Sequence, residues 1–167
     1  MARDVPDWLH RAREGWAHKG VDRPPFAEEP GPGQESVWDY PRPPKLVPDP
    51  REVVVRANGV ELARTRAALK LCETASPPTF YLPPADVRTD LLERAAGASF
   101  CEWKGEAQYW TAVAGDERLE GVAWTYPNPF GEYAPLAGYF AFYPSRVECF
   151  VGGERVRPQP GRFYGGW

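Results

Sequence analysis

The chain has 167 residues, of which 43% are hydrophobic and 26% charged, so it fits one globular domain and is not disordered throughout. Its net charge of −3 and the lack of a Lys/Arg stripe argue against nucleic acid as the main partner. The charged N-terminus lacks the apolar run of a signal peptide, and no stretch has the roughly 18 apolar residues of a membrane span. The sequence therefore predicts a cytoplasmic protein with no membrane partner.

Residues 1–50 are predicted to form a Pro-rich arm. Ten of the chain's 20 prolines fall in this range. Proline fixes φ and lacks an N–H donor, which excludes a long helix or a central strand. One short helix is expected, with Asp7 as its N-cap, Trp8 and Trp16 on one face, and Gly20 as its stop.

The arm is also expected to pack on the rest of the protein. It carries two large aromatic side chains, Trp38 and Tyr40, which a solvated linker would have little reason to contain. The predicted organisation is thus a packed arm over residues 1–50, a β domain over residues 51–157 and a C-terminal tail over residues 158–167.

From residue 52 the pattern becomes that of β-structure. The Asn58-Gly59 dipeptide between two apolar runs, residues 52–57 and 60–64, predicts a β-hairpin. A single helix is expected over residues 85–96, because apolar residues repeat there every four positions and a glycine follows. Further strands are predicted at residues 69–74, 79–82, 99–103, 107–114, 118–126, 139–143 and 147–151, with antiparallel pairing.

Cysteine and histidine usage argues against a metal site. Three scattered cysteines, Cys72, Cys101 and Cys149, are odd in number and suit free thiols better than disulfides. Both histidines, His10 and His18, fall in the arm, and their spacing does not match a helical zinc pair. The sequence therefore predicts no metal and no cofactor.

Several motifs recur in the order and spacing of a known family. They include PPTFYLP at residues 77–83, CEWKG at 101–105, AWTYP at 123–127 and GYFAFY at 138–143. Through them the segment from residue 60 to 156 resembles the domain of unknown function 427 family. The resemblance implies a mainly β (α+β) fold of two antiparallel sheets meeting at an angle, similar to the β-tent of the cereblon ligand-binding domain, and it implies no settled activity.

The family is sometimes labelled nucleotidyltransferase-like. Nucleotidyl transfer needs carboxylates that converge on magnesium and a Gly-rich or basic element that holds the phosphates. Asp116 and Glu117 fit a solvated hairpin turn, and Gly152-Gly153 fits a turn rather than a phosphate loop. These residues support the label only weakly.

Aromatic residues dominate the expected strands. In residues 124–126 two rings alternate onto one face, and elsewhere rings occupy the other face, so both faces of the sheet are aromatic. One face forms core, and the other must be covered by the arm, a second chain or a ligand. The predicted ligand-binding residues are Trp103, Tyr109, Trp124, Tyr126 and Tyr143.

Charged residues in apolar surroundings are the candidates for chemistry. Lys104 either reaches over an aromatic pocket or lies exposed in a hairpin turn. Glu73 could pair with Lys104 or with an arginine such as Arg66, in a functional or a purely structural ion pair. Cys101, three residues before Lys104, is a third catalytic candidate, although an inert core thiol is the favoured interpretation.

Two hypotheses of different classes fit these residues. The first is a small-molecule-binding domain, or an enzyme of unassigned chemistry, with an aromatic-lined pocket. The second is a structural or protein-interaction module, such as a homodimer, whose aromatic residues are covered by the arm or another chain. The position of Trp38 and Tyr40 distinguishes them, because these rings exclude a ligand if they fill the aromatic face.

Overall fold

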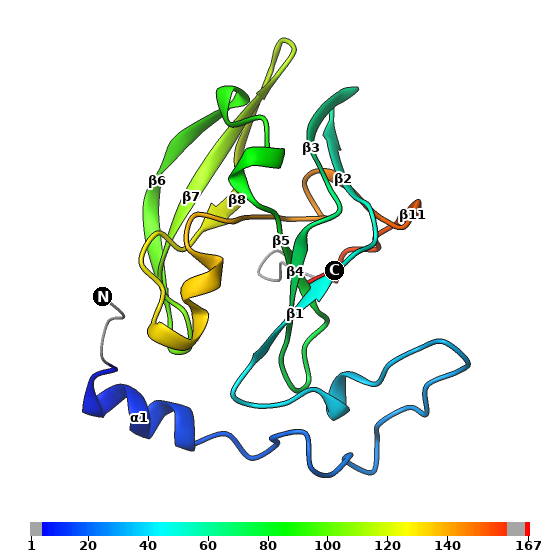
Figure 1. Ribbon diagram of the computed structural model, residues 1–167, viewed down its shortest axis with the longest axis vertical. Helices are drawn as coiled ribbons and strands as arrows, with labels where there is room; N and C mark the ends of the chain where they lie inside the picture. Colours follow the sequence, from blue (N-terminus) through cyan, green and yellow to red (C-terminus); the bar gives the residue numbers. More distant parts are fainter. Residues whose placement is uncertain (1–4, 160–165) are drawn as a thin grey trace.

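The computed structural model describes residues 5–159 and 166–167, and it confirms a mainly β, antiparallel fold (Figure 1). One α-helix, α1 (Asp7–Glu14), lies in the arm, and four short 3₁₀ helices lie in loops: η1 (Val37–Asp39), η2 (Pro84–Asp86), η3 (Thr89–Leu91) and η4 (Gly131–Leu136). The strands are β1 (Lys45–Asp49), β2 (Val53–Ala57), β3 (Val60–Thr65), β4 (Ala68–Cys72), β5 (Thr79–Tyr81), β6 (Leu92–Cys101), β7 (Gly105–Ala114), β8 (Glu117–Thr125), β9 (Phe140–Phe142), β10 (Glu148–Val151) and β11 (Glu154–Arg155).

The strands form three antiparallel sheets, where the family resemblance implies two. Their orders are β1-β4-β5, β11-β10-β2-β3 and β6-β7-β8-β9. Figure 1 shows β6, β7 and β8 on one side of the molecule and β2 and β3 on the other, with β1, β4 and β5 between and below them. Leu82, just after β5, and Phe140 in β9 exchange two backbone hydrogen bonds of 2.8 and 2.9 Å, which join the first and third sheets.

The hairpin predicted at Asn58-Gly59 is present. Strands β2 and β3 pair with Ala57 opposite Val60, so the turn has two residues. Asn58 and Gly59 have φ values of 48° and 73°, the left-handed conformations that a tight two-residue hairpin requires. The Asn58 side chain also donates a hydrogen bond of 3.0 Å to the carbonyl oxygen of Ala114, which ties the turn to β7.

The prediction of a helix over residues 85–96 is wrong. This stretch contains η2, η3 and the first half of β6. Val87 forms a β-bridge to Ala63 of β3, so its place in the apolar repeat reflects pairing between distant segments and not one face of a helix. Gly97, expected as a helix C-cap, has a φ of 90° and lies in β6 where its pairing with β7 shifts register.

The arm runs along the base of the molecule (Figure 1). Helix α1 is shorter than predicted: Pro6 and not Asp7 is its N-cap, and Gly15 ends it. Strand β1 falls in the range predicted to be arm and pairs with β4 at the edge of its sheet, a position that tolerates Pro48. Within residues 5–159 and 166–167, no helix is long and apolar enough to cross a membrane.

The buried apolar residues form two clusters. The first is centred on β2, β3, β7, β8 and β9 and is mostly aliphatic, with Val53, Val55, Leu62 and Phe142 fully buried. The second is mostly aromatic and lies against β5, β7, β8 and η4. Strand alternation separates them, because neighbouring residues of one strand, such as Tyr109 and Trp110, join different clusters.

Candidate functional site

A cavity of about 450 Å³ opens beside the aromatic cluster. Strand alternation builds its walls: Thr79 and Tyr81 face it from β5, and Ala107 and Tyr109 face it from β7. We call it the aromatic cavity; its lining residues are Thr79, Tyr81, Ser99, Phe100, Cys101, Glu102, Lys104, Ala107, Tyr109, Trp124, Tyr126 and Tyr143. The volume lies in the range of small-molecule sites, roughly 300–1,000 Å³.

Four of the five predicted ligand-binding residues line this cavity: Tyr109, Trp124, Tyr126 and Tyr143. The rings of Trp124 and Tyr143 are 4.5 Å apart, so they form one continuous aromatic wall. The fifth, Trp103, is buried but does not line the cavity; its ring lies under the guanidinium of Arg13, 4.9 Å away. The structure thus brings together four of these residues and separates the fifth from them.

Tyrosine hydroxyls make parts of this wall polar. The hydroxyls of Ser99 and Tyr109 are hydrogen-bonded at 2.6 Å. Burial, together with the neighbouring hydroxyl of Tyr109, raises the pKa of Tyr143 to about 12. Burial likewise raises the pKa of Tyr81 and of Tyr126. These three phenols are therefore uncharged at neutral pH and can act as hydrogen-bond donors.

Lys104 supplies a positive charge to the aromatic cavity. It ends the turn between β6 and β7, yet only 9% of it is exposed, so the alternative of an exposed turn lysine is wrong. Its Nζ lies 5.4 Å from the centre of the Tyr126 ring. Within the described residues, no carboxylate oxygen comes within 4.0 Å of this Nζ.

The protonation state of Lys104 follows from its surroundings. Burial alone would lower the pKa of its ammonium, because the charged form loses water. The groups around it oppose burial and raise the pKa: the ionised forms of Tyr81 and Cys101 favour the ammonium at high pH, and the Glu73 carboxylate favours it already at neutral pH. Lys104 therefore remains a cation at neutral pH, inside a wall of aromatic rings.

Glu73 lies close to this cation but not on the cavity wall. Its carboxylate is 3.6 Å from a guanidinium nitrogen of Arg42, a residue of the arm. The alternative prediction that Glu73 pairs with Arg66 is wrong, because Arg66 pairs with Glu52. Burial raises the pKa of Glu73, and the nearby charges of Lys104 and Arg42 oppose that shift.

Cys101, the third catalytic candidate, is half-buried at the end of β6 and lines the aromatic cavity. Its thiol is one of the groups next to the Lys104 ammonium. Cys72 and Cys149 are buried free thiols elsewhere in the fold. Of the three cysteines, only Cys101 is thus in a position to meet a molecule in the cavity.

Trp38 and Tyr40, the arm residues expected to cover an aromatic face if no ligand binds there, do not fill the aromatic cavity. Trp38 packs edge-on against His18 and Phe26, which are also arm residues, at 5.3 and 5.4 Å. Tyr40 donates a hydrogen bond of 2.8 Å to Glu35. Neither Trp38 nor Tyr40 lines the cavity, which stays open to solvent at one side.

Two arginines of the arm, which the sequence did not suggest, lie beside the cavity. Arg42 contacts Glu73, donates a hydrogen bond of 2.7 Å to the carbonyl oxygen of Thr74 and lies 4.1 Å from the Trp16 ring. Arg13 contacts the turn that carries Lys104. Their partners lie between 24 and 119 positions away in the chain, so no local pattern identifies these two residues.

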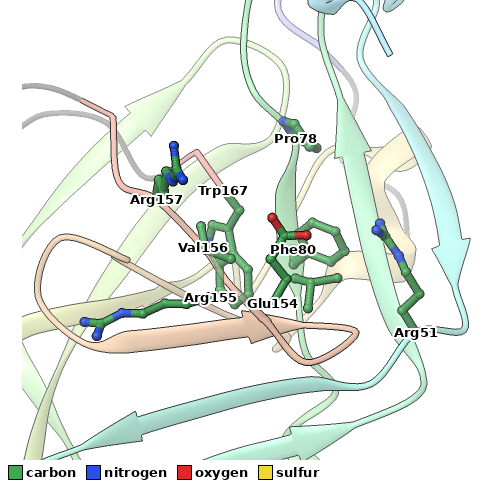
Figure 2. Close-up of a pocket in the computed structure, with 9 residues that line it drawn as sticks. Arg51, Pro78, Phe80, Glu154, Arg155, Val156, Arg157 and Trp167 are labelled. Atoms are coloured by element: carbon green, nitrogen blue, oxygen red, sulfur yellow. The ribbon is translucent and has the colours of Figure 1, made fainter. Parts of the chain in front are cut away.

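A second cavity, of about 380 Å³, lies on the other side of β5 (Figure 2). Phe80 and Trp167 form its apolar part, with ring centres 5.3 Å apart. Two of its three arginines are already paired: Arg51 contacts Asp49 at 2.7 Å, and Arg155 contacts Glu148 at 3.3 Å. Because Lys104 is buried without such a close partner, the aromatic cavity is the stronger candidate site.

Possible metal ligands do not come together in the described part of the chain. Within residues 5–159 and 166–167, no three His, Cys, Asp or Glu side chains are arranged to hold a metal ion. His10 lies in α1, and His18 follows it in the arm.

Comparison with known proteins assigns the chain to a family. A family model described as "Domain of unknown function (DUF427)" matches residues 45–153, which is well over half of the chain. The match begins at the first residue of β1 and ends in the turn after β10, so it contains the aromatic cavity and leaves out α1 and the rest of the arm. No curated protein matches the chain.

Proposed function

The chain belongs to the family described as Domain of unknown function (DUF427), and we propose that its aromatic cavity binds a small, planar organic anion. The observation that carries this proposal is the ammonium of Lys104, nine-tenths buried at a wall of aromatic rings with no carboxylate within 4.0 Å among the described residues. A buried charge requires a partner, and an anionic group of a ligand supplies one.

The rings define the other part of the ligand. Trp124, Tyr126 and Tyr143 present aromatic faces and edges to the cavity, and such surfaces favour a flat, unsaturated molecule. The hydroxyls of Tyr109 and Tyr143 add hydrogen-bonding positions. We therefore expect a carboxylate or phosphate group next to Lys104 and a planar body against the rings.

Binding is better supported than catalysis. The raised pKa of Lys104 keeps it protonated, which suits an anion-binding group and not a base or a nucleophile. Among the described residues, no histidine lines the cavity. Glu73 and Cys101 remain the candidates for a chemical step, but Glu73 does not line the cavity and forms an ion pair with Arg42.

Coverage of the cavity by the arm and nucleotidyl transfer both fit these observations less well. A structural module with all its aromatic residues covered by the arm would need Trp38 and Tyr40 in the cavity, and both lie elsewhere. For nucleotidyl transfer, Gly152-Gly153 would have to approach the site, yet this pair forms the turn between β10 and β11. Asp116 and the start of β8 likewise form the turn after β7.

The proposal is tested by isothermal titration with 2-naphthoate and its neutral counterpart, 2-naphthamide. The two probes have the same planar body and differ in the charge that Lys104 would meet. We expect the carboxylate to bind and the amide to bind at least tenfold more weakly, because a charge-assisted hydrogen bond contributes about 1.5–3 kcal/mol. Equal binding of both probes, or of neither, contradicts the proposal; adenosine monophosphate serves as the probe for the nucleotide alternative.

A further inference from the structure

The turn that carries Lys104 is held from outside by one side chain of the arm. Arg13, in the last turn of α1, donates hydrogen bonds to the carbonyl oxygens of Glu102, at 2.8 Å, and of Trp103, at 3.1 Å. These two residues immediately precede Lys104, and the three together connect β6 to β7. A guanidinium has five N–H donors in a rigid plane, so it can hold two successive carbonyl groups in one geometry.

The same guanidinium links this turn to η4. It forms an ion pair of 2.9 Å with Glu132, and it lies 4.9 Å from the Trp103 ring and 5.5 Å from the Phe130 ring. The backbone N–H of Phe130 in turn donates to the carbonyl oxygen of Lys104, at 3.2 Å. The Arg13 side chain is only 10% exposed, so its hydrogen bonds to the turn are largely shielded from solvent, whereas Glu132 is half-exposed.

Building on the proposed function, we infer that Arg13 is a positioning residue: it fixes the β6–β7 turn so that the ammonium of Lys104 faces the aromatic cavity. Arg13 does not line the cavity and would not touch a ligand. It lies outside the range of the family match, which begins at residue 45. The arm therefore contributes to the site. Residues 45–153 without the arm lack the side chain that orients Lys104.

Two other roles for Arg13 must be distinguished from positioning. It could attract an anion by its charge alone, in which case Arg13→Lys, which keeps the charge but loses the planar fork, would behave like the wild type. It could instead stabilise the whole fold, in which case its loss would raise the solvent exposure of Lys104 and of other buried lysines, such as Lys70, by the same factor. Arg11, on an exposed part of the same helix, provides the matched control.

The first measurement needs no ligand. Surface acylation with an N-hydroxysuccinimide ester, read by mass spectrometry, compares Lys104 with Lys70, which is largely buried in β4 and serves as the internal reference. In Arg13→Ala and Arg13→Lys we expect Lys104 to react roughly tenfold faster relative to Lys70, and in Arg11→Ala to react as in the wild type. An unchanged ratio in both Arg13 variants overturns the inference.

The second measurement tests whether Arg13 acts through Lys104. We expect both Arg13 variants to weaken 2-naphthoate binding roughly tenfold, and we expect no further loss when Arg13 is replaced in Lys104→Met. The inference is overturned if Arg13→Lys binds 2-naphthoate as tightly as the wild type. It is also overturned if replacing Arg13 weakens 2-naphthoate binding equally in the wild type and in Lys104→Met. If 2-naphthoate does not bind the wild type, the proposed function fails, and the acylation ratio still decides whether Arg13 positions Lys104.

Discussion

Replacing Lys104 by methionine tests the proposed site most directly. Methionine keeps the apolar, unbranched stem of lysine and removes only the ammonium. The free energy of unfolding depends on two opposing contributions. Burying the ammonium costs several kcal/mol, while the Tyr126 ring, 5.4 Å from Nζ, and the nearby charge of Glu73 return a similar amount. Arg42, whose guanidinium lies 3.6 Å from Glu73, is still available as its partner in the variant.

We therefore expect Lys104→Met to change the unfolding free energy by no more than about 1 kcal/mol. Binding should respond differently, because the ligand loses a charge-assisted hydrogen bond of about 1.5–3 kcal/mol, equivalent to a rise in Kd of roughly 10- to 150-fold. Urea unfolding and calorimetric titration with 2-naphthoate measure the two quantities on the same samples. The affinity for 2-naphthamide should stay the same.

One result would refute this reasoning. A loss of about 3 kcal/mol in unfolding free energy is the expected cost of breaking a buried ion pair. Together with unchanged 2-naphthoate affinity, it would show that Lys104 serves Glu73 structurally and not a ligand.

Three further predictions follow from the residues around the site. Glu102 lines the aromatic cavity, so Glu102→Gln should tighten 2-naphthoate binding about fivefold by removing a like charge; weaker binding would mean that the carboxylate assists the ligand. Burial raises the pKa of Glu73 above its unfolded value of roughly 4.3, so in urea unfolding the wild type should gain stability relative to Glu73→Gln as the pH falls from 7 through this raised pKa toward 4. The opposite shift would show that Arg42 stabilises the carboxylate more than burial disfavours it. Leu9 in α1 is fully buried, so Leu9→Ala should lower the unfolding free energy by about 2–4 kcal/mol, and unchanged stability would show that the helix is not docked.

Local signals predicted the parts of the fold that local chemistry determines. Asn58 and Gly59 adopt left-handed conformations readily, so the hairpin is evident from two residues. The apolar repeat in residues 85–96, by contrast, is compatible with more than one structure. Val87 satisfies it through a bridge to Ala63, and only the tertiary structure distinguishes this pairing from a helix face.

The candidate site shows the same division. Alternation within a strand correctly grouped Trp124 with Tyr126, because the period of two holds wherever the strand forms. Trp103 falls outside the cavity because it lies in a turn, where alternation ends. Arg13 had no local signal, since its partners at residues 102, 103 and 132 become neighbours only after the chain folds.

The pair of hydrogen bonds between Leu82 and Phe140 has a consequence for how the protein opens. Leu82 is fully buried and Phe140 nearly so, and their exchange of bonds makes β5 and β9 adjacent across two sheets. Neither sheet can detach without exposing these groups together, so the sheets form one cooperative unit. The amide hydrogens of both residues should exchange with solvent only through global unfolding, and at equal free energies, although they lie 58 positions apart in the chain.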